Sequence, residues 1–394
     1  MSLAEDSAAR LRDLEREDLL RRPPTLHTKL GRSVCIDGQT FLCFSSNDYL
    51  GLASPALDAE TLLQSSAEAS LGSGGSRLIS GTQRAHRDFE LKLAAFLDEE
   101  DGILFSTGYA ANLGLLQGLA EAGDLIVSDQ LNHASIIDGC RLSRARAAIF
   151  PHLDLGHLEA LLEERKSAKT LDPSLGRTFI VIESVFSMDG DEAPLKEIQR
   201  LARRNGAYLI VDEAHSFGLY GEQGRGLSAE LGVRPDLRIL AFGKSLGGSG
   251  AMVVGDSATV NLLRHRARSY VFSTAPSPLL LALLDSNLDR LIAAEDARRR
   301  LFRMSAKLRE RLRALGFRVL GERSPILPVI IGENRRALEL DRALRERGFL
   351  VQAIRPPTVP AGSARLRIVV SAAHRIEDID ALADAFEELK EFAS

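Results

Sequence analysis

The sequences AYLIVDEAHSFG, residues 207–218, and LRILAFGKSLGG, residues 237–248, decide the predicted fold. Each begins with an apolar run, 207–211 and 237–242, that is typical of a buried strand. The first run ends on Asp212 and leads to His215, and the second leads to Lys244. Ligands of open α/β sheets bind at the carboxyl ends of the strands. We therefore expect an acid, an imidazole and an amine at one edge of a sheet.

The chain around this stretch alternates between strand and helix patterns. Strands are predicted at 102–105, 124–127, 147–150, 178–182 and 251–254, and helices at 86–97, 155–166, 194–204 and after residues 108 and 133. This spacing predicts a mainly parallel sheet that helices cover on both faces, with right-handed crossovers. The fold class is therefore α/β.

Both ends of the chain lie outside this alternation. Residues 1–22 predict a helix that Pro23 and Pro24 end, and residues 32–44 predict a hairpin with Asp37-Gly38 at its turn. Residues 278–315 predict long helices, and strands at 326–331, 349–354 and 365–370 with helices at 334–347 and 376–392 predict a smaller α/β unit. We expect an N-terminal segment (1–45), a large domain (46–280) and a small C-terminal domain (281–394).

The composition excludes several classes of protein. A net charge of −4 without interleaved basic and aromatic residues does not favour nucleic-acid binding. No run of 18 apolar residues predicts a membrane span, and the charged first 18 residues are unlike a secretory signal. Cys35, Cys43 and Cys140 lack metal-ligand spacing, so we expect reduced thiols, no metal site and a cytoplasmic protein.

Three residues of the opening stretch suggest one chemistry. A lysine amine such as Lys244 forms a Schiff base with pyridoxal phosphate (PLP), whose ring accepts electrons when its nitrogen is protonated. Asp212 would keep that nitrogen protonated, and His215 would bond the ring oxygen or move protons. The alternative is that Asp212 caps a helix or forms a salt bridge, and that the lysine and histidine are ordinary polar residues.

Further segments are candidate ligand sites. A Ser-Thr-Gly turn opens the helix at Tyr109, and the N–H groups of a helix start bind phosphate. The glycine-rich loop LGSGGSRLISGTQ, 71–83, lets backbone approach a ligand or acts as a hinge. Arg355, stiffened by Pro356 and Pro357, would hold a carboxylate or be a surface arginine. Arg21 and Arg22 either compensate the dipole of the helix predicted at 1–22 or bind an anion, and the first interpretation is favoured.

Nine motifs in order resemble the α-oxoamine synthases, PLP enzymes of fold type I. They are SSNDYLGL, GSGGSRLISG, STGYAAN, NHAS, ESVFSMDGD, VDEAHSFG, GEQGRG, FGKSLGG and IRPPTVPAGSARLR. The resemblance runs from about residue 21 to the last helix. It is strongest to the members that condense L-alanine with a pimeloyl thioester, carried on CoA or acyl carrier protein, in biotin synthesis. Members that use glycine and acetyl-CoA, or serine and a long acyl chain, remain alternatives, as does a PLP-binding protein without catalysis.

The resemblance implies roles for individual residues. Lys244 is the Schiff-base lysine, Asp212 pairs with the ring nitrogen, His215 meets the ring oxygen and His133 stacks on the ring. For the cofactor, the resemblance also implies contacts of Gly108 and Tyr109 to the phosphate, of Ser187 to the cofactor, and of Ser273 and Thr274 to the phosphate in the partner subunit of a homodimer. For the substrates, it implies contacts of Asn47, Arg355 and Thr358 to the amino acid. Arg21, or Arg22 in its place, would contact the pimeloyl carboxylate.

Position 241 departs from the family pattern. The family has Thr or Ser three residues before the lysine, where the hydroxyl meets the cofactor phosphate, and this chain has Ala241. The loss of one neutral hydrogen bond costs roughly 0.5–1.5 kcal/mol, which weakens cofactor binding about tenfold at most. Ser245, next to Lys244, is a candidate to replace it.

Overall fold

The computed structural model describes residues 2–21, 23–28, 30–54 and 69–393. The chain divides into two compact units. The terminal unit comprises Met1–Ser54, Met188–Asp191 and Arg299–Ser394, and the sheet unit comprises Pro55–Ser187 and Glu192–Arg298. The three-part division expected from the sequence, with boundaries at 45/46 and 280/281, stays a prediction.

A seven-stranded sheet forms the centre of the sheet unit. Its order is β3-β9-β8-β7-β6-β4-β5, and every strand runs parallel to the rest except β9, which is antiparallel to β3 and β8. The strands are β3 (Asp101–Phe105), β4 (Leu125–Asp129), β5 (Arg146–Phe150), β6 (Thr178–Glu183), β7 (Tyr208–Asp212), β8 (Leu237–Ala241) and β9 (Ala251–Gly255). Each strand predicted in this region is present, and the mainly parallel sheet is confirmed.

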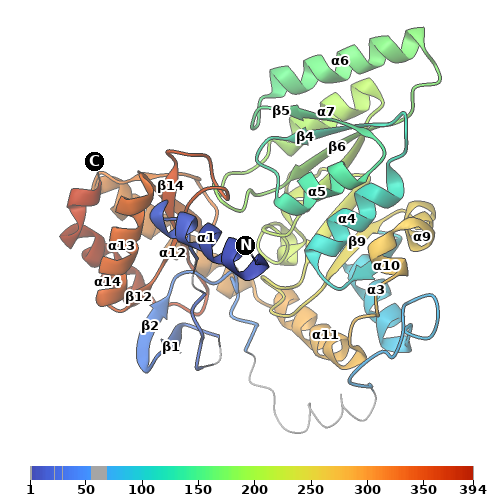
Figure 1. The fold of residues 1–394 in the computed structure, drawn as a ribbon. Coiled ribbons are helices and arrows are strands. Elements are labelled where there is room, and N and C mark those ends of the chain that lie inside the picture. The colour runs from blue at the N-terminus through green and yellow to red at the C-terminus, as the bar shows by residue number, and fades with distance from the viewer. Residues whose placement is uncertain (1, 22, 29, 55–68, 394) are drawn as a thin grey trace. The chain divides into compact units, whose positions relative to one another are not determined.

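Helices cover this sheet on both faces. They are α3 (Arg84–Phe96), α4 (Gly108–Leu119), α5 (Ala134–Leu142), α6 (Leu155–Leu171), α7 (Leu195–Asn205), α8 (Leu227–Leu231), α9 (Ser257–Arg266), α10 (Arg268–Val271) and α11 (Pro278–Ile292), and a 3-10 turn lies at Glu222–Gly224. Helix α4 packs on α5, and α6 packs on α7 (Figure 1). Right-handed crossovers place these two pairs on opposite faces, because the strand order reverses direction after β5. Leu115 of α4 lies in one buried hydrophobic cluster with Ile103 of β3 and Val181 of β6.

The terminal unit combines both ends of the chain. It holds α1 (Leu3–Arg16), β1 (Ser33–Ile36), β2 (Gln39–Cys43), β10 (Arg318–Val319), β11 (Ile326–Gly332), α13 (Asn334–Glu346), β12 (Phe349–Leu350), β13 (Gln352–Ile354), β14 (Ala364–Val369), α14 (Ile376–Glu388) and a 3-10 turn at Lys390–Phe392. Helix α12 (Glu295–Ala314) begins in the sheet unit and continues into the terminal unit. One sheet has the order β10-β11-β14-β13, and the hairpin β1-β2 gains β12 as a parallel third strand.

Two sequence predictions differ from the structure. The first helix ends at Arg16 rather than near residue 22, because Asp18 adopts a left-handed conformation (φ 55°) that interrupts it. Arg21 therefore lies outside that helix, and the dipole interpretation of this arginine is wrong; Arg22 lies outside the described residues. The predicted strand 349–354 is divided into β12 and β13, which pair in different sheets.

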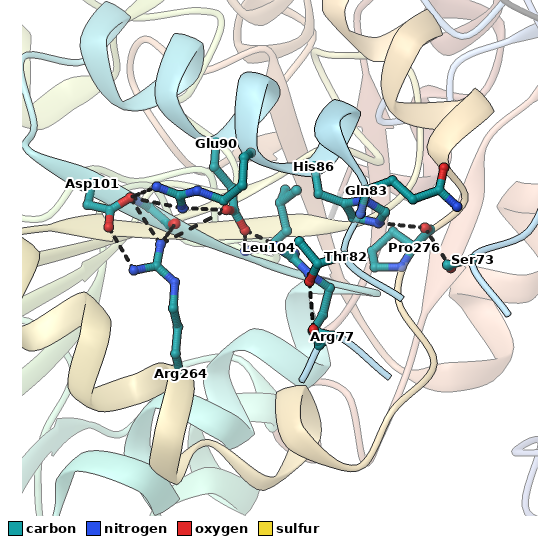
Figure 2. A network of polar contacts seen from close by, with 12 residues as sticks. Ser73, Arg77, Thr82, Gln83, His86, Glu90, Asp101, Leu104, Arg264 and Pro276 are labelled. Carbon is teal, nitrogen blue, oxygen red and sulfur yellow. Dashed lines mark hydrogen bonds and ion pairs between the residues drawn. The ribbon is translucent and has the colours of Figure 1, made fainter. Parts of the chain in front are cut away.

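A buried ionic network ties the glycine-rich loop to α3 (Figure 2). The fully buried Glu90 carboxylate forms ion pairs with Arg77 (2.9 Å) and Arg87 (2.6 Å) and accepts the backbone N–H of Leu104 at 3.1 Å. Arg264 of α9 binds Asp101 at the start of β3 at 2.7 Å. The loop, the helix, the strand and α9 are thus held together by charge, because each buried ion has a partner of opposite sign.

Removing the central charge of this network should destabilise the protein. Glu90→Gln leaves Arg77, whose side chain is 2% exposed, without its carboxylate, and breaking such a buried pair costs about 3–5 kcal/mol. Asp88→Asn, on the same helix, removes the exposed partner of Arg84 and should change stability by less than about 1 kcal/mol. Urea unfolding followed by circular dichroism measures both, and equal effects would contradict the role of Glu90.

Candidate active site

Five loops that leave the sheet at one edge carry the predicted cofactor residues. Strands β3, β4, β6, β7 and β8 are mutually parallel, so their carboxyl ends lie together. These ends lead respectively to Gly108 and Tyr109, His133, Ser187, His215 after Asp212, and Lys244. The structure thus brings these seven residues to the same edge of one sheet.

Asp212 is a buried carboxylate at the end of β7. It is 5% exposed. Its Oδ2 accepts a hydrogen bond from Asn112 Nδ2 at 2.8 Å, and its Oδ1 accepts the backbone N–H of Ala214 at 2.9 Å. Both of these hydrogen bonds come from neutral amide groups. A buried carboxylate of this kind calls for a cationic partner, since an unpaired buried charge is costly.

A chain of hydrogen bonds joins Asp212 to His133. Asn112 Nδ2 also donates to Ser135 Oγ at 3.0 Å, and Ser135 Oγ lies 2.7 Å from His133 Nδ1. The backbone N–H of Ser135 donates to the same Nδ1 at 3.2 Å. Because Nδ1 is an acceptor, the neutral imidazole carries its proton on Nε2.

The charges around His133 shift its titration. Desolvation of the ring lowers the pKa of His133, the Asp212 carboxylate opposes this, and the Lys244 ammonium lowers the pKa further. The Tyr109 ring meets the imidazole edge-on, with centroids 6.3 Å apart. His133 is therefore held as a neutral ring at neutral pH, close to the Asp212 and Lys244 charges.

The start of α4 provides free backbone donors. The Thr107 hydroxyl accepts the N–H of Ala110 at 3.0 Å, whereas the N–H groups of Gly108 and Tyr109 have no acceptor among the described residues. A Cβ at Gly108 would lie 3.5 Å from the Cβ of Ala241, so the end of β8 borders this helix start. Two free N–H groups at a helix start suit an anion such as phosphate.

The prediction that Ser245 replaces the hydroxyl missing at position 241 stays a prediction. It is 1% exposed, and its Oγ has no partner among the described residues. Its side chain packs against Gly218, where a Cβ would come within 2.5 Å of the Ser245 Cβ. The serine side chain is therefore engaged with the loop after β7.

Ser187 and His215 are buried, at 8% and 4% exposure, whereas Lys244 is half-buried.

Ser273 and Thr274 belong to a segment that is bridged to the glycine-rich loop. Thr274 pairs with Ser76, and the N–H of Ala275 donates to Gly75 O at 3.0 Å. Thr274 itself is exposed. A residue that serves a neighbouring subunit needs this exposure.

The predicted substrate residues lie in the terminal unit, and three of the four line one cavity. Arg21, Arg355 and Thr358 line a cavity of about 950 Å³. Arg21 Nη2 donates to Thr358 Oγ1 at 3.0 Å, and Arg355, 8% exposed, donates to the carbonyl of Asp18. Burial lowers the pKa of Arg355, and the Arg21 guanidinium lowers it further. Two guanidinium groups that repel each other in one cavity are prepared for an anion.

Asn47 does not line this cavity. It lies in the terminal unit, half-buried, with its Oδ1 accepting the Tyr49 hydroxyl at 3.4 Å. The structure thus groups Arg21, Arg355 and Thr358, and it places Asn47 apart from them within the unit.

Sequence reasoning missed three buried polar residues of the site. Asn112 anchors Asp212, and Asn132 binds Ser128 Oγ (2.9 Å) and Val181 O (2.8 Å). Glu183, the last residue of β6, is 2% exposed. The only available signal was their position inside the motifs STGYAAN, NHAS and ESVFSMDGD, which does not specify a partner. The roles assigned to the site residues stay predictions.

Comparison with known proteins identifies the family. Residues 39–386 match the model of aminotransferase class I and II. The chain is 44% identical to the 8-amino-7-oxononanoate synthase of Marinobacter nauticus over 88% of this chain and 86% of that protein. It is 43% identical to that of Herminiimonas arsenicoxydans, over 98% and 99%.

Solved structures agree. A serine palmitoyltransferase of S. paucimobilis with a bound PLP-myriocin aldimine matches with a TM-score of 0.92 and 29% identity, covering 100% of this chain and 99% of that one. The 8-amino-7-oxononanoate synthase of Francisella tularensis matches with a TM-score of 0.76 and 29% identity, over 89% and 98%. The expected fold class is confirmed. The chain therefore belongs to the class I and II aminotransferase family, among the α-oxoamine synthases.

Proposed function

We propose that this protein condenses L-alanine with a pimeloyl thioester, with loss of CO2, to give 8-amino-7-oxononanoate and a free thiol in biotin biosynthesis. The proposal rests on the similarity to 8-amino-7-oxononanoate synthases along almost the whole chain. The observation in the molecule that carries it is the gathering of Lys244, Asp212 and His133 at one sheet edge.

The residues at this edge fit PLP. Asp212, buried and hydrogen-bonded to two neutral amide groups, suits a protonated ring nitrogen, and the free N–H groups of Gly108 and Tyr109 suit the phosphate. Bound PLP supplies a ring that accepts the electrons released when the amino acid loses its Cα proton. His215 would hold the ring oxygen, Ser187 would contact the cofactor, and His133 would cover the ring face.

Lys244 has two tasks in this proposal. Its Nζ holds the cofactor covalently between turnovers. It then removes the Cα proton of alanine and returns a proton later. His133, neutral and with its proton on Nε2, can donate a hydrogen bond to a substrate oxygen without adding charge.

The cavity of the terminal unit would bind the carboxylates of the substrates. Arg355 and Thr358 would hold the alanine carboxylate, and Arg21 would bind the distal carboxylate of the pimeloyl group. Asn47, which does not line the cavity, stays a predicted contact of the alanine carboxylate. The repulsion between Arg21 and Arg355 that lowers the pKa of Arg355 is relieved when an anion enters. A charge-assisted bond of this kind contributes about 1.5–3 kcal/mol.

The proposal also covers the oligomeric state, the acyl carrier and the cellular location. A homodimer would let Ser273 and Thr274 reach the phosphate site of the partner subunit, in keeping with the exposure of Thr274. CoA and acyl carrier protein both remain candidate carriers of the pimeloyl group. The three cysteines are free thiols, which suits the reducing cytoplasm. None of the helices in the described part of the chain is long and apolar enough to span a bilayer.

The product of the reaction tests the function. Purified protein with PLP, L-alanine and pimeloyl-CoA should give 8-amino-7-oxononanoate in mass spectrometry, with one CoA and one CO2 released per product. Parallel reactions with glycine and acetyl-CoA, and with serine and palmitoyl-CoA, are the controls. Turnover only in one of those would assign the protein to another α-oxoamine synthase, and turnover in none would favour a non-catalytic PLP-binding protein.

Replacing the lysine should abolish both cofactor attachment and turnover. Lys244→Ala should lose the visible absorption band of the bound cofactor and all product, because no other amine follows β8 at this edge. Lys196→Ala, an exposed lysine on α7, should keep both. The spectrum and the product yield measure the effect, and an unchanged spectrum in Lys244→Ala would remove this residue from the mechanism.

Substitutions of Arg355 and Arg21 should raise the KM for different substrates. Arg355→Ala should raise the KM for alanine, and Arg21→Ala the KM for the pimeloyl thioester, each on the order of 10- to 100-fold, because each loses a charge-assisted bond to a carboxylate. Arg342→Ala, an exposed cation on the wall of the same cavity, should change either KM by less than about threefold. Steady-state kinetics with both substrates varied measures this, and equal effects of all three variants would refute the assignment.

A further inference from the structure

Three glutamates of the sheet unit are almost completely buried, and one of them differs from the others. Glu90 and Glu213 are 0% exposed and Glu183 is 2% exposed. Glu90 pairs with arginines, and Glu213 accepts the N–H groups of Leu227 and Ser228 (2.9 and 3.0 Å) and lies 3.6 Å from Arg238.

Glu183 lacks the arginine partner that Glu90 and Glu213 have. Its charge is offset by the backbone N–H groups of His133 and Ser187 and by the Lys244 ammonium, and its Oε1 has no hydrogen-bond partner among the described residues. A buried carboxylate normally has a cation or several donors to offset its lost hydration. The surroundings of Glu183 therefore suit a neutral carboxylic acid rather than an anion.

The strand register adds a second reason. Glu183 and Asp212 are paired residues on the neighbouring parallel strands β6 and β7, which lie about 4.8 Å apart in such a sheet. Two buried carboxyl groups at this spacing disfavour a second negative charge. Each carboxylate oxygen of Asp212 accepts a hydrogen bond, from Asn112 and from Ala214, whereas Oε1 of Glu183 has no partner among the described residues, so Asp212 is the better anion of the pair.

Glu183 also contacts both loops that carry predicted cofactor residues. The backbone N–H groups of His133 and Ser187 interact with its carboxyl group. Its own backbone N–H donates to Asn132 Oδ1 at 3.1 Å, next to His133 in the chain. One side chain thus connects the loops that follow β4 and β6.

We propose that Glu183 is a positioning residue that fixes the His133 and Ser187 loops as a neutral carboxylic acid, leaving Asp212 as the single negative charge of the pair. This rests on the proposed function, since Asp212 needs its charge only for a cationic ring nitrogen. A carboxylate at 183 would compete with Asp212 for that proton. The neutral acid avoids this competition while keeping both loops in place.

The titration of the group agrees with this geometry. Burial, and after it the Asp212 carboxylate, raises the pKa of Glu183 to about 8, against the opposing effects of Lys244 and of the His133 and Ser187 N–H groups. Asp212 faces it from β7, Lys244 from the loop after β8, and His133 from the loop before α5. The carboxyl group is therefore protonated at neutral pH.

Two substitutions separate the neutral from the charged form. Glu183→Gln keeps an acceptor oxygen and replaces the acid proton by an amide donor, so the Kd for PLP should stay within about threefold of wild type. Glu183→Ala removes the contacts to both loops and should weaken PLP binding on the order of tenfold. The Kd is measured from the visible band as PLP is added to the apoprotein.

Each other result contradicts the proposal. If Glu183→Gln loses as much affinity as Glu183→Ala, the negative charge is required and the neutral acid is wrong. If Glu183→Ala binds like wild type, Glu183 does not position the loops. Glu213→Gln is the matched control, because it removes a charge that Arg238 does need, and it should lower the Tm at every pH.

Stability against pH tests the protonation directly. The ordinary pKa of a glutamate is 4.5 and that of Glu183 in the folded protein is about 8, so between these values the folded protein holds a proton that the unfolded chain releases. The contribution of Glu183 is then fully present below about pH 4.5 and is lost as pH rises to about 8. The Tm of Glu183→Gln minus that of wild type should therefore rise with pH across this window and level off above it.

A flat difference in Tm would overturn the protonated state. The measurement uses full-length protein with saturating PLP and needs no turnover. It is therefore distinct from a failure of the proposed function, which would appear as wild-type protein that neither binds PLP nor forms product.

Discussion

The parallel pairing of β6, β7 and β8 is the constraint on which the site depends. Their register sets Glu183 beside Asp212 and Asp212 beside Ile239, so the loops that follow these strands must emerge at one edge. The apolar residues of the strands are buried on both faces, and a one-residue slip would turn each strand's side chains to the opposite faces. Packing of the apolar strand residues therefore also fixes the positions of the polar residues in the loops that follow the strands.

Buried polar groups at this edge are arranged by charge rather than by packing. Asn112 divides its two donor hydrogens between Asp212 and Ser135 and so couples the carboxylate to His133. In a medium of low dielectric such contacts are strong, and an unmatched charge is costly. With Glu183 as the neutral acid that we propose, Asp212 is the single negative charge of the pair and is available for a cationic ligand.

The anion-binding features belong to another part of the chain. Arg21 and Arg355 come from segments more than 300 residues apart, yet they line one cavity of the terminal unit. Burial, and after it the Arg21 guanidinium, lowers the pKa of Arg355, whereas a salt bridge would raise it. The predicted cofactor residues and the predicted carboxylate-binding residues thus belong to separate compact units, each with its own sheet.

The sequence by itself determined the elements that depend on local pattern. Apolar runs gave the strands, alternation gave the parallel sheet, and Asp37-Gly38 gave the hairpin, since both residues take the positive φ that such a turn needs (49° and 81°). The nine motifs indicated the family and the order of the candidate residues. Only the tertiary structure decided the early end of α1, the pairing of β12 with β2, and the contacts of Asn112 and Glu183. Asn112 and Asp212 are 100 residues apart, and a contact over that distance leaves no periodic trace in either segment, because it is set by how the strands are ordered in the sheet.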